Sequence, residues 1–250
     1  MTAVQMDSSN RFPTTVWGVV HFAQDRQNAQ WRDAMNRCIA AYWKPVFFFI
    51  RAKGYPLHRA EELTQDFFLK FFARDWIRLA DEQRGRFRTF LLTILSRFLS
   101  DEGPERKPRQ RAFDDQLISI SELRANSEPS LEPPDHRTPE DLFMREWAKA
   151  LMANVQKSLE LWCFCRGRPD WYRVFRETYF PADAESQITQ QELAQRLEIT
   201  RDKVRYALAE VQRQFSELLR AEVAEQSGPD CDIEAEIREL EALLAGSSGS

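Results

Sequence analysis

The spacing of apolar residues is the feature that most limits what this chain can fold into. Strand signals are scarce, whereas apolar side chains recur every three or four residues over long stretches, which is typical of helices that bury one face. One such stripe runs from Trp31 to Ile50, and Pro45 inside it predicts a kink or a break. Two more stripes follow at about 58–80 and 88–101. The pattern predicts an all-α fold.

The composition changes between residues 104 and 138. This stretch contains five prolines, few large apolar residues and charges of both signs, which is typical of a linker. Helical spacing resumes after Thr138 and Pro139, a pair suited to the start of a helix. We therefore expect a small three-helix domain at 15–103, a flexible linker at 104–138 and a second small helical domain at 139–224.

The end of the second domain has the pattern of two short helices joined by a tight turn. Thr189 and Glu192 form a capping box at the start of the first helix, and Thr200 caps the second. Cations and a tyrosine then crowd the outer face of the second helix. The candidate DNA-binding residues are Thr200, Arg201, Lys203, Arg205, Tyr206 and Arg213. The pattern is typical of a helix-turn-helix, whose second helix enters the major groove.

Two observations support a plainer interpretation of the same segment. Asp202 and Glu210 lie among the cations, so the alternative is a solvated helix with ion pairs. Glu198 occupies the turn position where glycine is common, and a left-handed backbone there costs about 1 kcal/mol.

A loop rich in arginine precedes the third helix of the first domain. Its cations alternate with Gly85 and an aromatic residue, which suits a phosphate track with a platform for base stacking. The candidate residues of this strip are Arg84, Arg86, Phe87, Arg88 and Arg97. For Phe87 the alternative is a core anchor.

Charge and metal-ligand spacing exclude several classes of protein. The net charge is −4 and the pI is near 5.6, so the positive charge is local. No apolar run reaches membrane-spanning length, and four scattered cysteines favour a reducing cytoplasm. His21, His58 and His136 are far apart, and Cys163 and Cys165 lack a second ligand pair. We expect no metal, no cofactor, no membrane association and no enzymatic activity.

Three segments, in this order, resemble sigma-70-type RNA polymerase sigma factors. AEELTQDFF (60–68) resembles their region 2.2, GRFRTFLLTILSRFLSDE (85–102) their regions 2.3 and 2.4, and ELAQRLEITRDKVRYALAEVQRQFSELL (192–219) their region 4.2 helix-turn-helix. Two helical domains joined by a linker are similar to the extracytoplasmic-function class, in a branch common in planctomycete-like bacteria. Arg97 and Glu198 depart from the usual asparagine and glycine.

The resemblance implies a protein that binds core RNA polymerase and promoter DNA and directs transcription initiation. The arginine strip would then capture the −10 element, and the helix-turn-helix would read the −35 element. The polymerase would dock on a polar helix face made of Glu62, Gln65, Asp66 and Lys70. The resemblance also implies an inhibitory partner of the anti-sigma type, with defence-associated proteins, including those of CRISPR systems, as one source.

Two other functions remain open from the sequence. A two-domain helix-turn-helix transcriptional regulator explains the second domain and leaves the first without a task. A helical adaptor that binds only proteins is the other alternative.

The acidic tail, 225–250, carries an apolar stripe of its own, made of Ile233, Ile237, Leu240 and Leu244. One interpretation is a solvated, frayed tail, since so short a helix is unstable alone. The other is a helix that docks on the chain with its apolar side down and lowers the positive potential near the DNA-reading surfaces.

Overall fold

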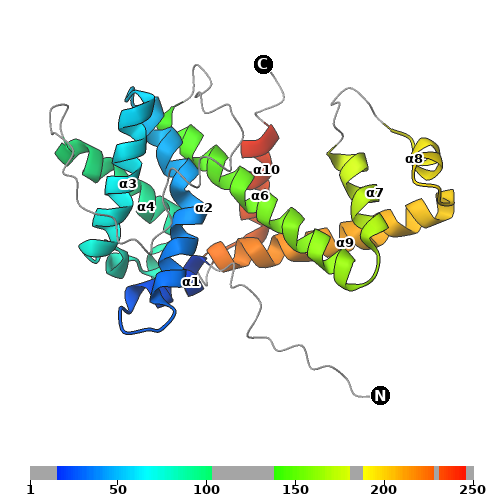
Figure 1. The fold of residues 1–250 in the computed structure, drawn as a ribbon, viewed down its shortest axis with the longest axis horizontal. Helices are drawn as coiled ribbons and strands as arrows, with labels where there is room; N and C mark the ends of the chain where they lie inside the picture. Colours follow the sequence, from blue (N-terminus) through cyan, green and yellow to red (C-terminus); the bar gives the residue numbers. More distant parts are fainter. Residues whose placement is uncertain (1–15, 103–137, 181–187, 228–230, 246–250) are drawn as a thin grey trace. The chain divides into compact units, whose positions relative to one another are not determined.

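A computed structural model describes residues 16–102, 138–180, 188–227 and 231–245 (Figure 1). These residues form nine α-helices and two short 3-10 helices, with no strand among them. The predicted all-α fold class is confirmed. Most of the predicted linker, 104–138, and the terminal Gly-Ser run lie outside the described ranges. The chain divides into two compact units, residues 1–149 with 224–250, and residues 150–223.

The first unit contains helices from both ends of the chain. Its elements are α1 (Val16–Gln24), α2 (Trp31–Ala52), α3 (Leu57–Ala73), η2 (Trp76–Leu79), η3 (Glu82–Arg84), α4 (Phe87–Glu102), the start of α6 (Pro139–Cys165), the end of α9 (Arg201–Gln226) and α10 (Ile233–Ala245). The predicted break at Pro45 does not occur, because α2, which is 22 residues long, continues through this position. Val46 and Phe47 beside it are fully buried. This burial offsets the roughly 3 kcal/mol that an internal proline costs.

Phenylalanine fills the core of the first unit. Phe87, at the start of α4, is fully buried and meets Tyr42 of α2 and Phe71 of α3, with ring centroids 5.4 and 6.4 Å apart. Trp17 of α1 meets the same ring at 5.8 Å. All three pairs are close to edge-to-face, the geometry that aromatic quadrupoles favour. Phe87 therefore connects four helices.

The unit boundaries differ from the predicted domain boundaries at 139 and 225. α6 begins in the first unit, where Phe143 packs against Phe49 of α2 with their ring centroids 6.5 Å apart. Thr138 accepts a hydrogen bond from the Asp141 backbone, so the predicted N-cap is confirmed. Because α6 is one continuous 27-residue helix, its cap does not coincide with the division between the units.

The second unit holds the remainder of α6 and α9 together with α7 (Pro169–Tyr179) and α8 (Gln190–Arg196). One core cluster consists of Val174, Leu193, Ala194, Val204, Ala207 and Leu208. A second cluster consists of Leu159, Cys163, Phe175 and Val211. α7, α8 and α9 thus share a core that fixes the helix-turn-helix.

Within the described ranges, no helix is both long enough and apolar enough to cross a membrane.

Candidate nucleic-acid interface

The helix-turn-helix of the second unit begins and turns as its sequence predicts. The Thr189 side chain accepts a hydrogen bond from the Glu192 backbone, and the Glu192 carboxylate accepts one from the Thr189 backbone. The bond from the Thr189 backbone N–H, and then one that the Thr189 hydroxyl donates, lower the pKa of the Glu192 carboxyl. The capping box therefore fixes the start of α8.

The turn between α8 and α9 is a Schellman motif. The Ile199 N–H donates to the Ala194 carbonyl at 3.0 Å, and the Glu198 N–H donates to the Gln195 carbonyl at 3.3 Å. Glu198 has a φ of 54°, so the predicted left-handed residue is present. Ile199 packs on the core cluster of this unit, which sets the direction in which α9 leaves the turn.

The first turns of α9 present cations to solvent. The Thr200 hydroxyl accepts a hydrogen bond from the Lys203 backbone at 3.3 Å and caps the helix. Arg201, Lys203 and Arg205 are exposed. Arg205 pairs with the exposed Asp202 at 3.2 Å. Arg201 and Lys203 face solvent beside the positive end of the helix dipole, an arrangement that favours phosphate.

Tyr206 and Arg213 follow on the outward face of α9. Tyr206 is 60% exposed, and its ring packs close to edge-to-face with Trp171 of α7, with centroids 5.8 Å apart. Arg213 lies about 10 Å further along the helix, from the rise of 1.5 Å per residue. Glu210 and Glu217 hold its guanidinium at 3.1 and 2.8 Å, and they raise the pKa of Arg213, Glu210 most strongly. Arg213 is therefore engaged within its own helix, whereas Arg201 is exposed at the helix start.

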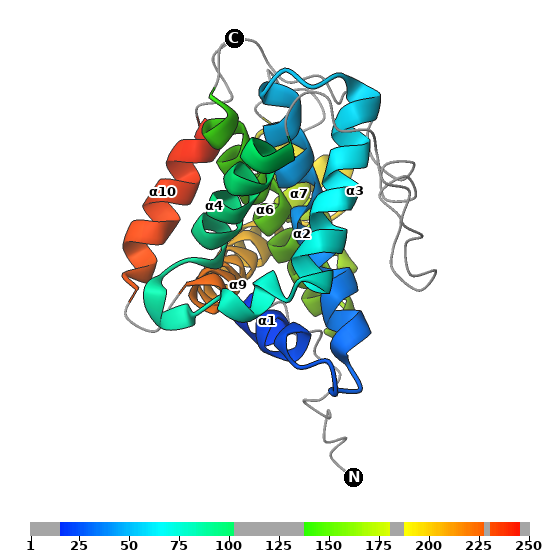
Figure 2. The same cartoon turned by 90° about the vertical axis from the view of Figure 1, so that its left-hand side faces the viewer.

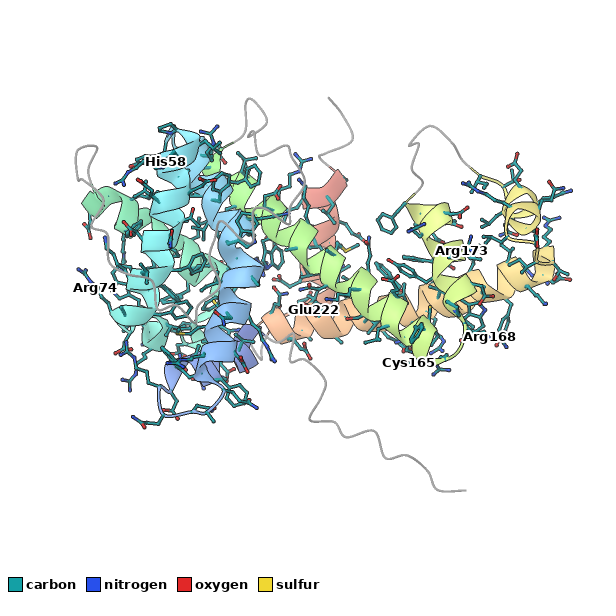
Figure 3. The ribbon with its side chains drawn as sticks, in the orientation of Figure 1. His58, Arg74, Cys165, Arg168, Arg173 and Glu222 are labelled. Carbon is teal, nitrogen blue, oxygen red and sulfur yellow. The ribbon has the colours of Figure 1, made fainter. Side chains whose placement is uncertain are left out.

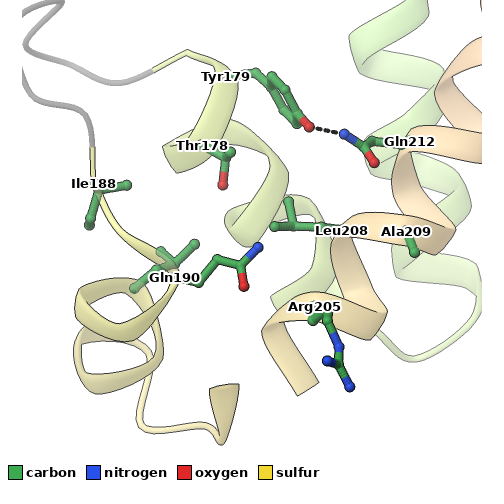
Figure 4. A pocket seen from close by; sticks show the side chains of 9 residues that line it. Thr178, Tyr179, Ile188, Gln190, Arg205, Leu208, Ala209 and Gln212 are labelled. Carbon is green, nitrogen blue, oxygen red and sulfur yellow. Dashed lines mark hydrogen bonds between the residues drawn. The ribbon is translucent and has the colours of Figure 1, made fainter. Parts of the chain in front are cut away.

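A pocket of about 310 Å³ lies beside this helix (Figure 4). It opens between the end of α7, the start of α8 and the face of α9 that carries Arg205 and Leu208. Gln212 donates a hydrogen bond to the Tyr179 hydroxyl at its rim. The lining is mixed apolar and polar, with Arg205 as its charged residue.

The arginine loop of the first unit is only partly exposed. Gly85 has a φ of 116°, a backbone conformation that residues other than glycine rarely adopt. Arg84 before it is exposed and pairs with Asp81 at 3.2 Å. Arg97, more than two turns into α4, is also exposed. Phe87 is a core residue, so the predicted base-stacking platform is not present in this structure.

Arg86 and Arg88 form ion pairs with glutamates of α10, which lies beside α4 (Figure 2). Arg88 is 2% exposed, and its Nη2 lies 2.6 Å from Glu236 Oε2 and 3.7 Å from Glu239 Oε1. Arg86 pairs with Glu239 at 2.7 Å and also with Glu236. Burial, and then the charge of Arg86, lower the pKa of Arg88 to about 10, while Glu239 opposes this shift. Arg88 therefore remains charged at neutral pH, and the prediction that it lies on an open DNA-binding strip does not match its burial.

Trp147 and Gln226, which the sequence did not indicate as site residues, lie next to these ion pairs. The Arg88 guanidinium lies 4.0 Å from the centroid of the Trp147 ring of α6, within cation–π range. The Trp147 indole N–H donates a 2.7 Å hydrogen bond to Gln226 at the end of α9. The apolar stripe of the tail was a signal for α10, and its docking is confirmed, with Ile237 and Leu240 buried. Nothing in the sequence signalled Trp147 or Gln226 as its neighbours.

The predicted polymerase-docking residues share α3. Glu62, Gln65, Asp66 and Lys70 are all half-buried. Glu62 pairs with Arg59 at 2.9 Å and with His58 at 3.3 Å. The Lys70 amine lies 4.8 Å from the Phe98 ring centroid. Spacing of three and four residues places the polar groups on one face of the helix.

The thiols are not arranged as metal ligands. All four cysteines are free, and no group of three His, Cys, Asp or Glu side chains within the described ranges could hold a metal ion. Cys165 is exposed at the end of α6, with Arg168 in the turn that follows (Figure 3). Burial raises the pKa of Cys38 to about 12, and burial is the main cause that raises that of Cys163 to about 11.

Comparison with known proteins identifies no relative: no family model, curated protein or solved structure matches the chain.

Proposed function

We propose that this protein is a sigma factor of the extracytoplasmic-function type, which binds core RNA polymerase and directs it to promoters. The second unit reads the −35 element with Arg201, Lys203 and Arg205. The first unit captures the −10 element and docks on the polymerase through the polar face of α3. An inhibitory partner protein of the anti-sigma type belongs to the same proposal.

The single observation that carries the proposal is the helix-turn-helix of the second unit. Its second helix starts at a side-chain cap after a Schellman turn and exposes three cations in its first two turns. Arginine pairs with guanine edges in the major groove, and lysine pairs with phosphate. A solvated helix with ion pairs accounts less well for Arg201, because the positive end of the helix dipole disfavours a cation in the first turn.

The test is initiation by purified core polymerase. We expect the full chain to give a transcript with a defined 5′ end from a library of promoter fragments, and core polymerase alone to give none. The variant Arg201→Gln with Arg205→Gln should still bind core polymerase but lose the −35 dependence of initiation.

The same experiment separates the alternatives. A helix-turn-helix regulator would bind selected duplexes and leave core polymerase inactive. An adaptor that binds only proteins would bind no duplex and would also leave core polymerase inactive. Either result would refute the proposed function.

A further inference from the structure

Within the first unit, α10 packs against a surface that contains Arg86, Arg88 and Trp147, which we call the seat of α10. Both apolar burial and ion pairs hold the helix there. Ile237 and Leu240 of α10 are buried, and Glu236 and Glu239 beside them form ion pairs with Arg86 and Arg88. Two arginines and two glutamates balance in charge. The seat therefore accepts an anionic ligand and pairs it fully.

Arg88 is held in place for such a ligand, and Arg86 lies beside it on the solvent side. Trp147 lies against the Arg88 guanidinium at 4.0 Å and keeps it in place from the α6 side. Arg86 is about one-third exposed and Glu239 slightly more, so this outer pair faces solvent, whereas Arg88 and Glu236 are buried. An arginine that an aromatic ring holds in place binds phosphate oxygens as readily as carboxylate oxygens.

The negative charge of α10 would let this helix compete with nucleic acid for Arg86 and Arg88. The helix has four glutamates and one arginine, a net charge of −3. Glu234 and Glu241 are exposed, so two glutamates of the helix lie at the seat and two lie on its exposed side. Because α10 belongs to the same chain, its effective concentration at the seat is high without tight binding.

We infer that α10 is an anionic lid: Glu236 and Glu239 occupy the place at Arg86 and Arg88 that phosphates of single-stranded DNA take when α10 leaves. The inference rests on the proposed role of the 84–88 loop in capturing DNA. The apparent affinity of the seat for DNA is its intrinsic affinity multiplied by the fraction of molecules with the lid open.

The experiment compares two full-length variants with equal net charge. E236Q/E239Q removes the carboxylates that face the seat, and E234Q/E241Q removes the two that face solvent. The probe is a fluorescent single-stranded oligonucleotide at low and moderate salt. We expect E236Q/E239Q to bind at least about tenfold more tightly than the intact chain, since a lid that is open for no more than a tenth of the time gives at least that ratio. E234Q/E241Q should show only the small gain that comes from net charge.

A third variant ties the gain to the seat. Adding Arg86→Gln to E236Q/E239Q should abolish the extra affinity. Opening of the lid is followed independently by alkylation of Cys231, whose thiol lies 3.4 Å from Glu236 in the closed form. The variant for this readout is E239Q, which keeps that carboxylate, and its Cys231 should react faster than that of the intact chain. If circular dichroism shows that E236Q/E239Q does not fold, the single E239Q variant retains the buried Arg88–Glu236 pair and should still bind several-fold more tightly.

Equal affinities of the two double variants overturn the inference, as does a gain that survives Arg86→Gln. Initiation assays on the same proteins keep the two proposals apart. If none of them initiates while the order of DNA affinities holds, the sigma-factor proposal fails and the lid stands. If the intact chain initiates and the variants bind DNA equally, only the lid fails.

Discussion

Arg88 and Glu236 form a buried ion pair, with Arg88 Nη2 2.6 Å from Glu236 Oε2 and both side chains at most 2% exposed. They are 148 residues apart in the chain. The pair therefore joins the start of α4 to α10 inside the first unit.

Removing one partner of this pair should be costly. In Glu236→Ala the charge of Arg88 keeps only Glu239 at 3.7 Å, so we expect a loss of about 3–5 kcal/mol in the free energy of unfolding of the first unit. Glu239→Ala, at a site 37% exposed, should cost no more than about 1 kcal/mol. Urea unfolding followed by tryptophan fluorescence measures both. Equal losses would contradict the burial of the pair.

Glycine at position 198 should stabilise the second unit. Glu198 has a φ of 54°, and relief of this strain exceeds the entropy that glycine adds to the unfolded chain. We expect Glu198→Gly to raise the free energy of unfolding by about 0.5–1 kcal/mol. Ala209→Gly, in the interior of α9, should lower it by about 1 kcal/mol. Thermal unfolding compares the two, and a loss in both would rule out strain at Glu198.

Arg201 and Arg213 should differ in their effect on DNA reading. Arg201 is exposed in the first turn of α9, whereas Arg213 is held by Glu210 and Glu217. Arg201→Gln should cost roughly 1–3 kcal/mol on the preferred duplex and relax selectivity at one base pair. Arg213→Gln should leave selectivity unchanged. Binding to single-base variants of the duplex measures this, and loss of selectivity in Arg213→Gln alone would place the reading surface elsewhere.

Charge reversal on α3 should abolish docking on the polymerase. Glu62 and Asp66 are four residues apart on one helix face, so Glu62→Lys with Asp66→Lys changes that face by four charges. Binding to core polymerase in a titration should be lost while helicity is kept. The control with the same change in net charge is Asp101→Lys with Glu241→Lys, which should bind normally. Normal binding by the α3 variant would remove this face from the proposal.

Three of the four thiols, Cys165, Cys38 and Cys163, should react in the order of their exposure. Cys165 is exposed, whereas burial raises the pKa of Cys38 to about 12, and the pKa of Cys163 is raised to about 11. A disulfide reagent at pH 8 should label Cys165 first and reach Cys38 and Cys163 only on unfolding. Because thiols ionise near 9.0 in the unfolded chain, the stability from these two groups is full below that pH and is lost as the pH rises through 11 to 12. Rapid labelling of Cys38 would contradict its place in the core.

The sequence by itself determined the helices and their caps. Apolar spacing predicted α3, α4 and α10, and hydrogen-bonding side chains fixed the ends at Thr138, Thr189 and Thr200. These features are local: spacing and caps depend on residues within a few positions of one another. The left-handed conformation of Glu198 was predicted for the same reason.

Only the tertiary structure decided which of the candidate residues are exposed. Arg84 and Arg88 look alike in sequence, yet one faces solvent and the other lies between Trp147 and Glu236. Phe87 became a core residue because four helices converge on its ring, and Pro45 stayed within a helix because its neighbours are buried. The free energy of burial depends on contacts between segments far apart in the chain, which no local pattern records.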